Sequence, residues 1–399
     1  MRVTPTTRAW VPAAVLFASF LDIFALLPTV APYARSFGAS TIAVGVVVGA
    51  YSFTNIPANI VGGMLVDRHG RRRVIISALF AAAFTVAAYS YATTTAALII
   101  TRLLHGIAGG ILMPAVFALA SDRATDGGHG RTFGRVGAVI GLAAVIAPAT
   151  AGIVRQAYGF DTVFYGVSAV LVLGAVFVFI TVHDRPTDIV LTPLTSTMTL
   201  PTGAFVGLLN VAALRRALVA TVMLTLAAGV LAAYLPDAAE TLGARASTVG
   251  TLFTVYALFA GAVMLSKLSR SVDTFGADRP ASFGLVVIAV AFVVFAVAPR
   301  VGVLALGAAV FGAGYGMVFP AVSAATSLAT TPDMRGRAFG LFNVAFSVGL
   351  AFGPVTVGGV AARIDGVEPF SVAAGILGVT ACLLMAITYR NDRKQTFHG

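Results

Sequence analysis

The sequence predicts an all-α membrane protein with twelve transmembrane helices, arranged as two pseudo-symmetric bundles of six. Of its 399 residues, 58% are hydrophobic and 10% are charged, whereas a soluble domain carries about 25% charged residues. The chain also repeats itself, because HGRTFG at 129–134 returns as RGRAFG at 335–340. The same offset of 206 residues carries Gly106 onto Gly312 and Pro114 onto Pro320. A repeat of half the chain in so apolar a sequence indicates a duplicated membrane domain.

Twelve apolar stretches are long enough to cross a membrane as helices. A helix rises 1.5 Å per residue, so about 20 residues cross the ~30 Å of hydrocarbon. The stretches lack the alternation of polar and apolar residues that a β-barrel shows. They lie at 10–33, 42–65, 74–92, 96–120, 134–156, 162–182, 216–235, 247–267, 280–298, 301–327, 337–360 and 370–389. We therefore expect an N-terminal six-helix bundle at 1–182, a cytoplasmic interdomain linker at 183–215 and a C-terminal six-helix bundle at 216–399.

The net charge of +11 is unevenly distributed along the chain. If both termini are cytoplasmic, most Lys and Arg residues fall in cytoplasmic segments, as the positive-inside rule requires. We therefore expect a multi-pass protein of the cell inner (plasma) membrane with cytoplasmic termini and no basic patch for nucleic acid. The single cysteine, Cys382, excludes an intramolecular disulfide.

The loop after the second span reads GMLVDRHGRRR at 63–73. It resembles the signature loop of the major facilitator superfamily, and with twelve helices in two repeats the resemblance covers the whole chain. The resemblance implies a secondary transporter in which this loop latches the two halves on the cytoplasmic side in the outward-facing state. The gate residues that it implies are Gly63, Asp67, Arg68, Gly70, Arg71 and Asp122, with Asp273 and Gly276 as a weaker counterpart.

The residue types in this loop suit such a latch. A carboxylate is stabilised at a helix N-terminus by the partial positive charge there, so we expect Asp67 to cap the eleventh span near Gly336. We expect Gly63 to allow close helix approach and Gly70 to allow a tight turn. An arginine of the loop can pair with Asp122, and Asp273 should approach the start of the fifth span.

The fourth span carries an arginine within the membrane. Leu98, Arg102 and Gly106 form a pattern that resembles the family's helix 4 motif, whose arginine is associated with proton coupling. An arginine in hydrocarbon costs several kcal/mol unless it meets water or an anion. His105 stands where the motif usually has Gln. It is either a neutral histidine between packed helices or a direct proton relay.

Asp22 is the only acidic residue well inside a span. Counted by helix rise from the span ends, Asp22 lies ~18 Å and Arg102 ~27 Å from the inner edge of the membrane. These depths are comparable within the precision of the span ends. We therefore expect Asp22 to pair with Arg102 and to bind and release one proton, the alternative being a static pair that orders the bundle. The proton-coupling candidates are Asp22, Arg102 and His105.

The fifth and eleventh spans carry residues that suit helix bending. They resemble the family's antiporter motif, although the fifth span has alanine at three of its glycine positions, Ala143, Ala147 and Ala151. Small residues allow close helix crossing, and proline removes a backbone donor and permits a kink. The expected bending residues are Pro148, Gly152, Gly349, Gly353 and Pro354. LDxxxxxP at 21–28 also resembles drug–proton antiporters with twelve helices.

The second half lacks the charges of the first, because Asp22 maps to Ala228 and Arg102 to Ala308. We therefore expect coupling in the first half and an apolar, aromatic wall in the second. Such side chains also commonly just pack helices, and the two asparagines on the second span suit interhelical hydrogen bonds or substrate contact. The candidate cavity residues are Asn55, Asn59, Tyr234, Tyr256, Tyr315, Asn343 and Phe346.

Together these observations predict a monomeric secondary active transporter that works by rocker-switch alternating access. Proton-coupled efflux of amphipathic or apolar small molecules is the favoured activity, with protons, a small-molecule substrate and the bilayer as partners. The sequence shows no Walker loop, no metal-ligand cluster and no nucleophile–base constellation, so we expect no enzyme activity, cofactor or metal. Two alternatives remain open: a facilitator or proton symporter for a small metabolite such as a sugar, and a non-transporting receptor or scaffold on the same fold.

Overall fold

A computed structural model describes residues 11–121, 129–182, 207–266, 276–329 and 335–396, except for some side chains near helix ends. The regular structure in these residues is helical. The chain forms two compact units. Unit 1 comprises Met1–Ala43, Ala50–Ser196 and Arg245–Thr254, and unit 2 comprises Val44–Gly49, Thr197–Ala244 and Val255–Gly399.

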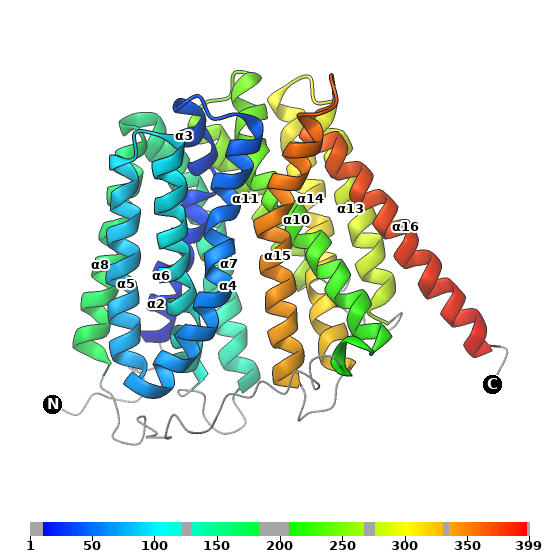
Figure 1. Ribbon diagram of the computed structural model, residues 1–399, viewed down its shortest axis with the longest axis horizontal. Coiled ribbons are helices and arrows are strands. Elements are labelled where there is room, and N and C mark those ends of the chain that lie inside the picture. Colours follow the sequence, from blue (N-terminus) through cyan, green and yellow to red (C-terminus); the bar gives the residue numbers. More distant parts are fainter. Residues whose placement is uncertain (1–10, 122–128, 183–206, 267–275, 330–334, 397–399) are drawn as a thin grey trace. The chain divides into compact units, whose positions relative to one another are not determined.

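Most of unit 1 comes from the first half of the chain, whose helices are drawn from blue to green in Figure 1. Its elements are α2 (Val11–Leu26), α3 (Val30–Ser36), α4 (Thr41–His69), α5 (Arg71–Ala88), the 3-10 turn η1 (Tyr89–Tyr91), α6 (Thr95–Ser121), α7 (His129–Tyr158) and α8 (Phe160–Thr181). Helix α2 packs against α6, α7 and α8, while α5 packs against α6 and α8. Buried residues accordingly occur along the whole length of α2, from Val11 to Leu26.

Unit 2 repeats this packing with the helices of the second half. They are α10 (Ala212–Thr241), α11 (Ala246–Leu265), α13 (Asp278–Ala296), α14 (Val301–Leu328), α15 (Arg335–Ala361) and α16 (Pro369–Thr396), although α11 belongs to unit 1 as far as Thr254. Helix α10 packs against α14, α15 and α16, and α13 packs against α14 and α16. Each of these pairs is the repeat counterpart of a pair in unit 1, so the internal repeat of the sequence is also a repeat of structure.

Each of the twelve predicted spans coincides with helix. In the described part of the chain, eleven helices are long and apolar enough to cross a membrane, and there are twelve if the bent pair α2 and α3 is counted as one span. The sequence predicts that first span as one continuous helix, whereas the structure bends it by 40° between Leu26 and Val30. Pro28 lies in this break, where its missing N–H removes a helix hydrogen bond.

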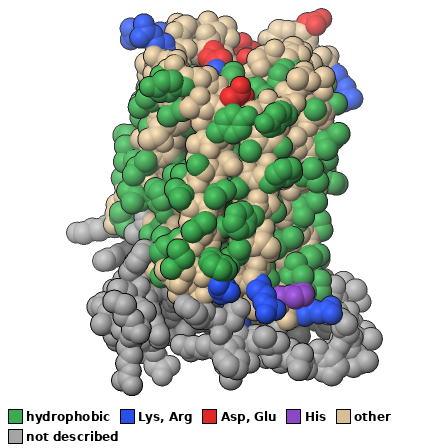
Figure 2. Space-filling view, turned by 90° about the vertical axis from the view of Figure 1, so that its left-hand side faces the viewer, with side chains coloured by type: hydrophobic (Ala, Val, Ile, Leu, Met, Phe, Trp, Pro, Cys, Tyr) green, Lys and Arg blue, Asp and Glu red, His purple; other side chains and the backbone are tan. Residues whose placement is uncertain are grey.

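The predicted linker ends later than the structure indicates. Helix α10 begins at Ala212, inside the segment 183–215, and residues 183–206 lie outside the described part of the chain. On the face of the molecule drawn in Figure 2, a broad band of hydrophobic side chains separates two ends that carry charged side chains. Such a band is what a protein surrounded by lipid presents.

Candidate functional site

A buried carboxylate lies near the end of α2. Asp22 is 3% exposed, and its Oδ2 lies 2.9 Å from Nε2 of His105 on α6, which is 1% exposed. Its other oxygen, Oδ1, has no hydrogen-bond partner among the residues that the structure describes. Because burying a carboxylate is costly unless it is hydrogen-bonded, the contact with His105 stabilises Asp22 in this position.

Close packing of α6 against α4 brings His105 to this place. A Cβ atom at Gly106 would overlap the carbonyl oxygen of Tyr51, and one at Gly109 would overlap the Tyr51 hydroxyl. Thr54 Oγ1 donates a hydrogen bond to the carbonyl of Leu103, at 2.6 Å, across the same contact. The glycines therefore permit the close approach that sets the Tyr51 ring edge-on to the His105 ring, with centroids 5.0 Å apart.

Tyr89, in η1, joins His105 to Arg102. Its hydroxyl lies 2.9 Å from His105 Nδ1 and accepts a longer hydrogen bond, 3.4 Å, from Arg102 Nη1. The Arg102 guanidinium also lies over the ring of Tyr51, with Cζ 5.0 Å from the centroid, which is a cation–π geometry. Tyr89 is fully buried and Arg102 is 9% exposed. Asp22, His105, Tyr89 and Arg102 thus form one connected chain of polar side chains, called the polar cluster below.

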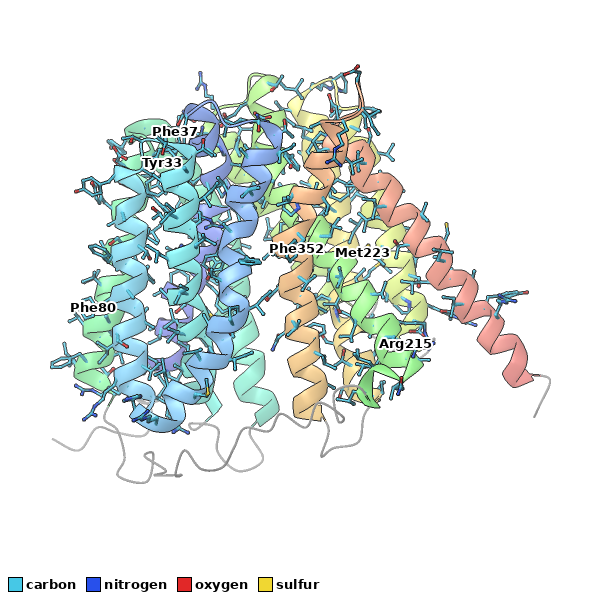
Figure 3. The ribbon with its side chains drawn as sticks, viewed as in Figure 1. Tyr33, Phe37, Phe80, Arg215, Met223 and Phe352 are labelled. Carbon is cyan, nitrogen blue, oxygen red and sulfur yellow. The ribbon has the colours of Figure 1, made fainter. Side chains whose placement is uncertain are left out.

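Tyr33, on α3, fixes the position of η1. Its hydroxyl lies 2.8 Å from the carbonyl oxygen of Tyr89 and 3.1 Å from that of Ala92, and donates to them. Its ring packs edge-on against Phe37, with centroids 4.7 Å apart, and both residues are labelled in Figure 3. The ring of Tyr89 itself packs edge-on against Phe164 of α8 at 5.3 Å. Tyr33 therefore fixes the backbone of Tyr89, and Phe164 packs against its ring.

The polar cluster can hold a variable number of protons. Arginine is a permanent cation, whereas a carboxylate and an imidazole each exist in two protonation states. Asp22 and His105 share a hydrogen bond in an otherwise apolar part of unit 1. A proton gained or lost there changes the net charge of a buried site, which is what coupling to a proton gradient requires.

The structure pairs Asp22 differently from the sequence-based expectation. Asp22 contacts His105 directly, while Arg102 joins the same cluster through Tyr89. The predicted depths differed by ~9 Å, and His105 lies three residues farther along α6, about 4.5 Å nearer the depth of Asp22. Helix rise therefore favours His105 over Arg102 as the direct partner.

The predicted cytoplasmic gate is described only in part. Gly70 has φ of 80° between α4 and α5, and Gly276 has φ of 71° before α13, so both backbones favour glycine. Nothing among the described residues lies within 4 Å of a Cβ at Gly63, whereas a Cβ at its neighbour Gly62 would lie 2.8 Å from Ile111 Cα. Close approach of α4 to α6 therefore falls on Gly62, and the close approach expected at Gly63 stays a prediction.

The remaining gate residues add little geometry. Arg68 is exposed in the last turn of α4, and Arg71 is partly buried at the start of α5. The side chains of Asp67, Asp122 and Asp273 lie outside the described part of the structure. Their contacts with helix ends and arginines stay predictions.

The two asparagines of α4 bond to each other and to α6. Asn59 Nδ2 lies 2.6 Å from Asn55 Oδ1, and Asn55 Nδ2 donates to the carbonyl of Gly106 at 3.4 Å. Thr54 and Asn55 therefore both bond across the α4–α6 contact. This geometry favours interhelical hydrogen bonding, the first of the two roles that the sequence leaves open for them.

The helix-bending residues lie inside long helices at close contacts. Pro148 is inside α7, and a Cβ at Gly152 would overlap the carbonyl oxygen of Ala246, in a segment that belongs to the same unit. In unit 2, a Cβ at Gly353 would lie 2.7 Å from Leu226 Cα. The remaining members behave alike: a Cβ at Gly349 would overlap Val222 and Thr225, and Pro354 lies inside α15 next to Gly229 of α10.

Aromatic side chains of unit 2 form a continuous row on α11, α14 and α15. The ring of Tyr256 lies 5.3 Å from Phe311 and 5.6 Å from Tyr315, and Phe346 lies 6.3 Å from Phe342. Of the other predicted cavity residues, Asn343 is exposed, whereas Tyr234 is buried. The Tyr234 hydroxyl donates to the carbonyl of Pro354 at 2.6 Å and so ties α10 to α15.

The repeat of the polar cluster is an aromatic cluster. His105 corresponds to Phe311, and Tyr89 corresponds to Phe295. The T-shaped pair of Tyr51 and His105 is matched by the T-shaped pair of Tyr256 and Phe311, at 5.0 and 5.3 Å. Unit 2 thus keeps this one ring pair, while apolar side chains stand at the positions of Asp22, Tyr89, Arg102 and His105.

Sequence reasoning missed the three tyrosines that surround the cluster, Tyr33, Tyr51 and Tyr89. Tyrosines near span ends usually lie at the membrane interface, and the pattern YSY at 89–91 gives no sign that its two tyrosines differ. In the structure Tyr89 is fully buried and Tyr91 is 75% exposed. The only signal available in the sequence was the repeat, which aligns Tyr51 with Tyr256.

The fold and the buried charges define a polytopic α-helical membrane transporter built from two repeats. The family model described as Major Facilitator Superfamily matches residues 13–216 and again residues 217–398. The chain belongs to the major facilitator superfamily. It is accordingly a transporter of small molecules and not an enzyme.

Known relatives and solved structures agree with this assignment. The chain is 24% identical over 377 residues to "Multidrug resistance protein 1" of Bacillus subtilis (strain 168), covering 93% of this chain and 94% of that protein. It is 24% identical over 171 residues to "Quinolone resistance protein NorA" of Staphylococcus aureus, covering 42% and 43% of the two chains. Its fold matches the crystal structure of the nucleoside transporter NupG with a TM-score of 0.78 at 15% identity, covering 96% of this chain and 99% of that one. A crystal structure of the peptide transporter POT gives 0.79 at 16% identity, with coverage of 96% and 94%.

Proposed function

We propose that this transporter exports amphipathic or apolar small molecules from the cytoplasm in exchange for protons. The observation that carries the proposal is the polar cluster, in which the carboxylate of Asp22 is buried beside His105 in an apolar bundle. Ionisable side chains within spans are costly and commonly mark ion or proton pathways. The names of the relatives, a multidrug resistance protein and a quinolone resistance protein, support export of apolar drugs.

In this proposal Asp22 binds a proton in one access state and releases it in the other. Arg102 stays charged and favours the carboxylate, whereas burial favours the neutral acid, so modest movements near Asp22 suffice to load or unload the proton. The bundles at 1–182 and 216–399 alternate access as two rocking halves of a monomer, with both termini cytoplasmic in the plasma membrane. The segment 63–73, which joins the end of α4 to the start of α5 through Gly70, forms the cytoplasmic latch.

The test is dye transport by the purified full-length protein in proteoliposomes with an imposed pH gradient. We expect ethidium or another lipophilic dye to accumulate on the acidic side of the membrane. Protons should cross in the opposite direction as the dye moves. Asp22→Asn should abolish accumulation, because the amide keeps the size of the side chain but does not titrate. Asp161→Asn, which changes an exposed carboxylate of α8 in the same unit, is the matched control and should behave as wild type.

Three outcomes would overturn the proposal. Full gradient-driven accumulation by Asp22→Asn would remove Asp22 from the coupling. Accumulation of a sugar, and not of any dye, would favour the metabolite facilitator or symporter. Binding without flux for every compound in a broad library would favour the receptor or scaffold.

A further inference from the structure

The hydrogen-bond partners of Tyr89 determine where its single hydroxyl proton points. Arg102 has no acceptor atom, so the bond between Arg102 Nη1 and the Tyr89 hydroxyl, at 3.4 Å, must use a lone pair of the tyrosine oxygen. The positive charge of the guanidinium also repels the hydroxyl proton. The proton is therefore directed to the other neighbour of the hydroxyl, His105 Nδ1 at 2.9 Å.

The other side of the imidazole leads to the same assignment. An ionised carboxylate only accepts hydrogen bonds, so the 2.9 Å contact between Asp22 Oδ2 and His105 Nε2 requires a hydrogen on Nε2. With Nδ1 accepting from Tyr89 and Nε2 donating to Asp22, His105 is neutral. Both nitrogens of the ring are then fully used.

A second proton on His105 would break this network. His105 would then donate from Nδ1 to the Tyr89 hydroxyl, which would also still accept from Arg102, and the tyrosine proton would have to point elsewhere. Tyr89 is fully buried, and the described residues offer its hydroxyl no other hydrogen-bond partner. A buried donor without a partner costs free energy, so the imidazolium is disfavoured in this geometry.

We propose that Tyr89 is a positioning residue that holds His105 neutral, with its hydrogen on Nε2, so that the exchanged proton is carried by Asp22 and not by His105. This inference rests on the proposed proton coupling. Asp22 Oδ1 is buried and, among the described residues, has no hydrogen-bond partner, which leaves it as the basic atom able to accept the proton. Binding forms an O–H bond at Oδ1 and leaves the contact between Oδ2 and His105 in place. Release returns the proton to water and restores the carboxylate.

Among the described residues, the neighbours of the pair do not offer another acid at this place. The titratable and charged groups around the pair are Tyr51 of α4 and Tyr89 of η1, which contact His105, and Arg102 of α6, which bonds to Tyr89. Helices α7 and α8 also pack on α2. On α7, Arg155 lies beyond the end of α2, with Nη1 3.5 Å from the carbonyl of Pro28, and Asp161 of α8 is exposed.

Nitrogen NMR of the full chain, labelled at the histidine rings and reconstituted in nanodiscs, reports this state directly. The chain has five histidines, and comparison with His105→Gln identifies the signals of His105. We expect wild-type His105 to keep one protonated ring nitrogen, Nε2, across the pH range in which dye exchange changes. Infrared difference spectra over the same range should show a carboxylic acid band that is missing in Asp22→Asn.

Tyr89→Phe removes the hydroxyl and frees Nδ1. We expect His105 in this variant to become doubly protonated on acidification, and the pH profile of exchange to broaden because a second group now titrates. Tyr91→Phe changes the exposed tyrosine two residues along and should leave both readouts as in wild type. If Tyr89→Phe does not fold, the wild-type tautomer still tests the inference, because a hydrogen on Nδ1 would exclude a hydrogen bond donated by Tyr89 to that atom.

A doubly protonated His105 in the wild type within the pH range of exchange would overturn the inference. So would identical His105 titration in wild type and folded Tyr89→Phe. The NMR assignment does not depend on transport. A failure of proton-coupled dye export with His105 neutral would therefore count against the proposed function alone.

Discussion

Asp22 Oδ2 and His105 Nε2 lie 2.9 Å apart although 83 residues separate them in the chain. The contact forms because α2 packs against α6 within unit 1 and because glycines of α6 allow α4 to approach closely from another side. It gives histidine the role of hydrogen-bond donor to the buried acid. Substitutions at position 105 should therefore be sorted by whether they can donate a hydrogen bond.

His105→Gln should retain proton-coupled export, because the glutamine amide can donate to Asp22 Oδ2. His105→Leu should lose it, since a hydrogen bond to a charged group contributes about 1.5–3 kcal/mol, a factor of roughly 10–100 in the population of the carboxylate state. Initial rates of dye accumulation in proteoliposomes measure the difference. Equal loss in both variants would show that the imidazole itself is required.

Arg102→Ala should move the pH profile of substrate exchange to higher pH. The cation favours ionised Asp22, so its loss favours the protonated acid, and the proton is then released only under more alkaline conditions. Exchange should stall near neutral pH and partly recover at alkaline pH. Arg102→Lys keeps the charge without the planar fork and should give an intermediate profile. A uniformly reduced profile with an unchanged midpoint would assign Arg102 to folding or substrate binding.

Gly109→Ala should destabilise unit 1, because its Cβ would overlap the hydroxyl of Tyr51. Overpacking of this kind typically costs about 1–3 kcal/mol. Gly141→Ala on α7, where nothing described lies within 4 Å of the new Cβ, is the matched control and should be neutral or slightly stabilising, because alanine favours helix. Thermal unfolding in detergent, followed by intrinsic fluorescence, compares the two. A similar unfolding temperature for both variants would contradict the tight α4–α6 contact.

Asp67→Asn should shift the protein toward inward-facing states by weakening the proposed latch. A carboxylate at a helix N-terminus contributes about 0.3–1 kcal/mol, and up to ~2 when partly buried, so the populations should change by a factor of roughly 2–30. Asp273→Asn should have a smaller effect, because its loop keeps fewer of the signature residues. Distances between spin labels across the cytoplasmic mouth report the shift. A larger effect at Asp273 would reverse the predicted asymmetry.

The sequence predicts the helices well because each span must be apolar and long enough to cross a membrane. It misses the bend after Leu26, since Pro28 alone does not say whether a helix kinks or ends. The sequence also does not show which of two adjacent glycines, Gly62 or Gly63, contacts α6. A one-residue step turns a helix by 100°, and only packing fixes which glycine faces α6. To identify the partner of Asp22, the depth of each residue in the membrane must be known to within one helix turn. Span ends cannot be predicted that precisely from the sequence.

Tyr89 and Tyr91 show the same limit for side chains. The two tyrosines lie two residues apart and are the same residue type, yet Tyr89 is fully buried and Tyr91 is 75% exposed. The difference comes from Tyr33, whose hydroxyl fixes the η1 backbone, and from the Phe164 ring. Contacts of this kind join residues far apart in sequence and leave no local pattern.

The aromatic cluster of unit 2 shows which residues of the polar cluster the fold does not need for its stability. Phe311 packs edge-on against Tyr256 as His105 packs against Tyr51, and Ala308, where unit 1 has Arg102, is fully buried. The architecture is therefore sustained without ionisable groups, and replacing buried charges by apolar residues is often neutral or stabilising. The buried charges of unit 1 are therefore not explained by the stability of the architecture, and the proposed proton coupling gives them a function.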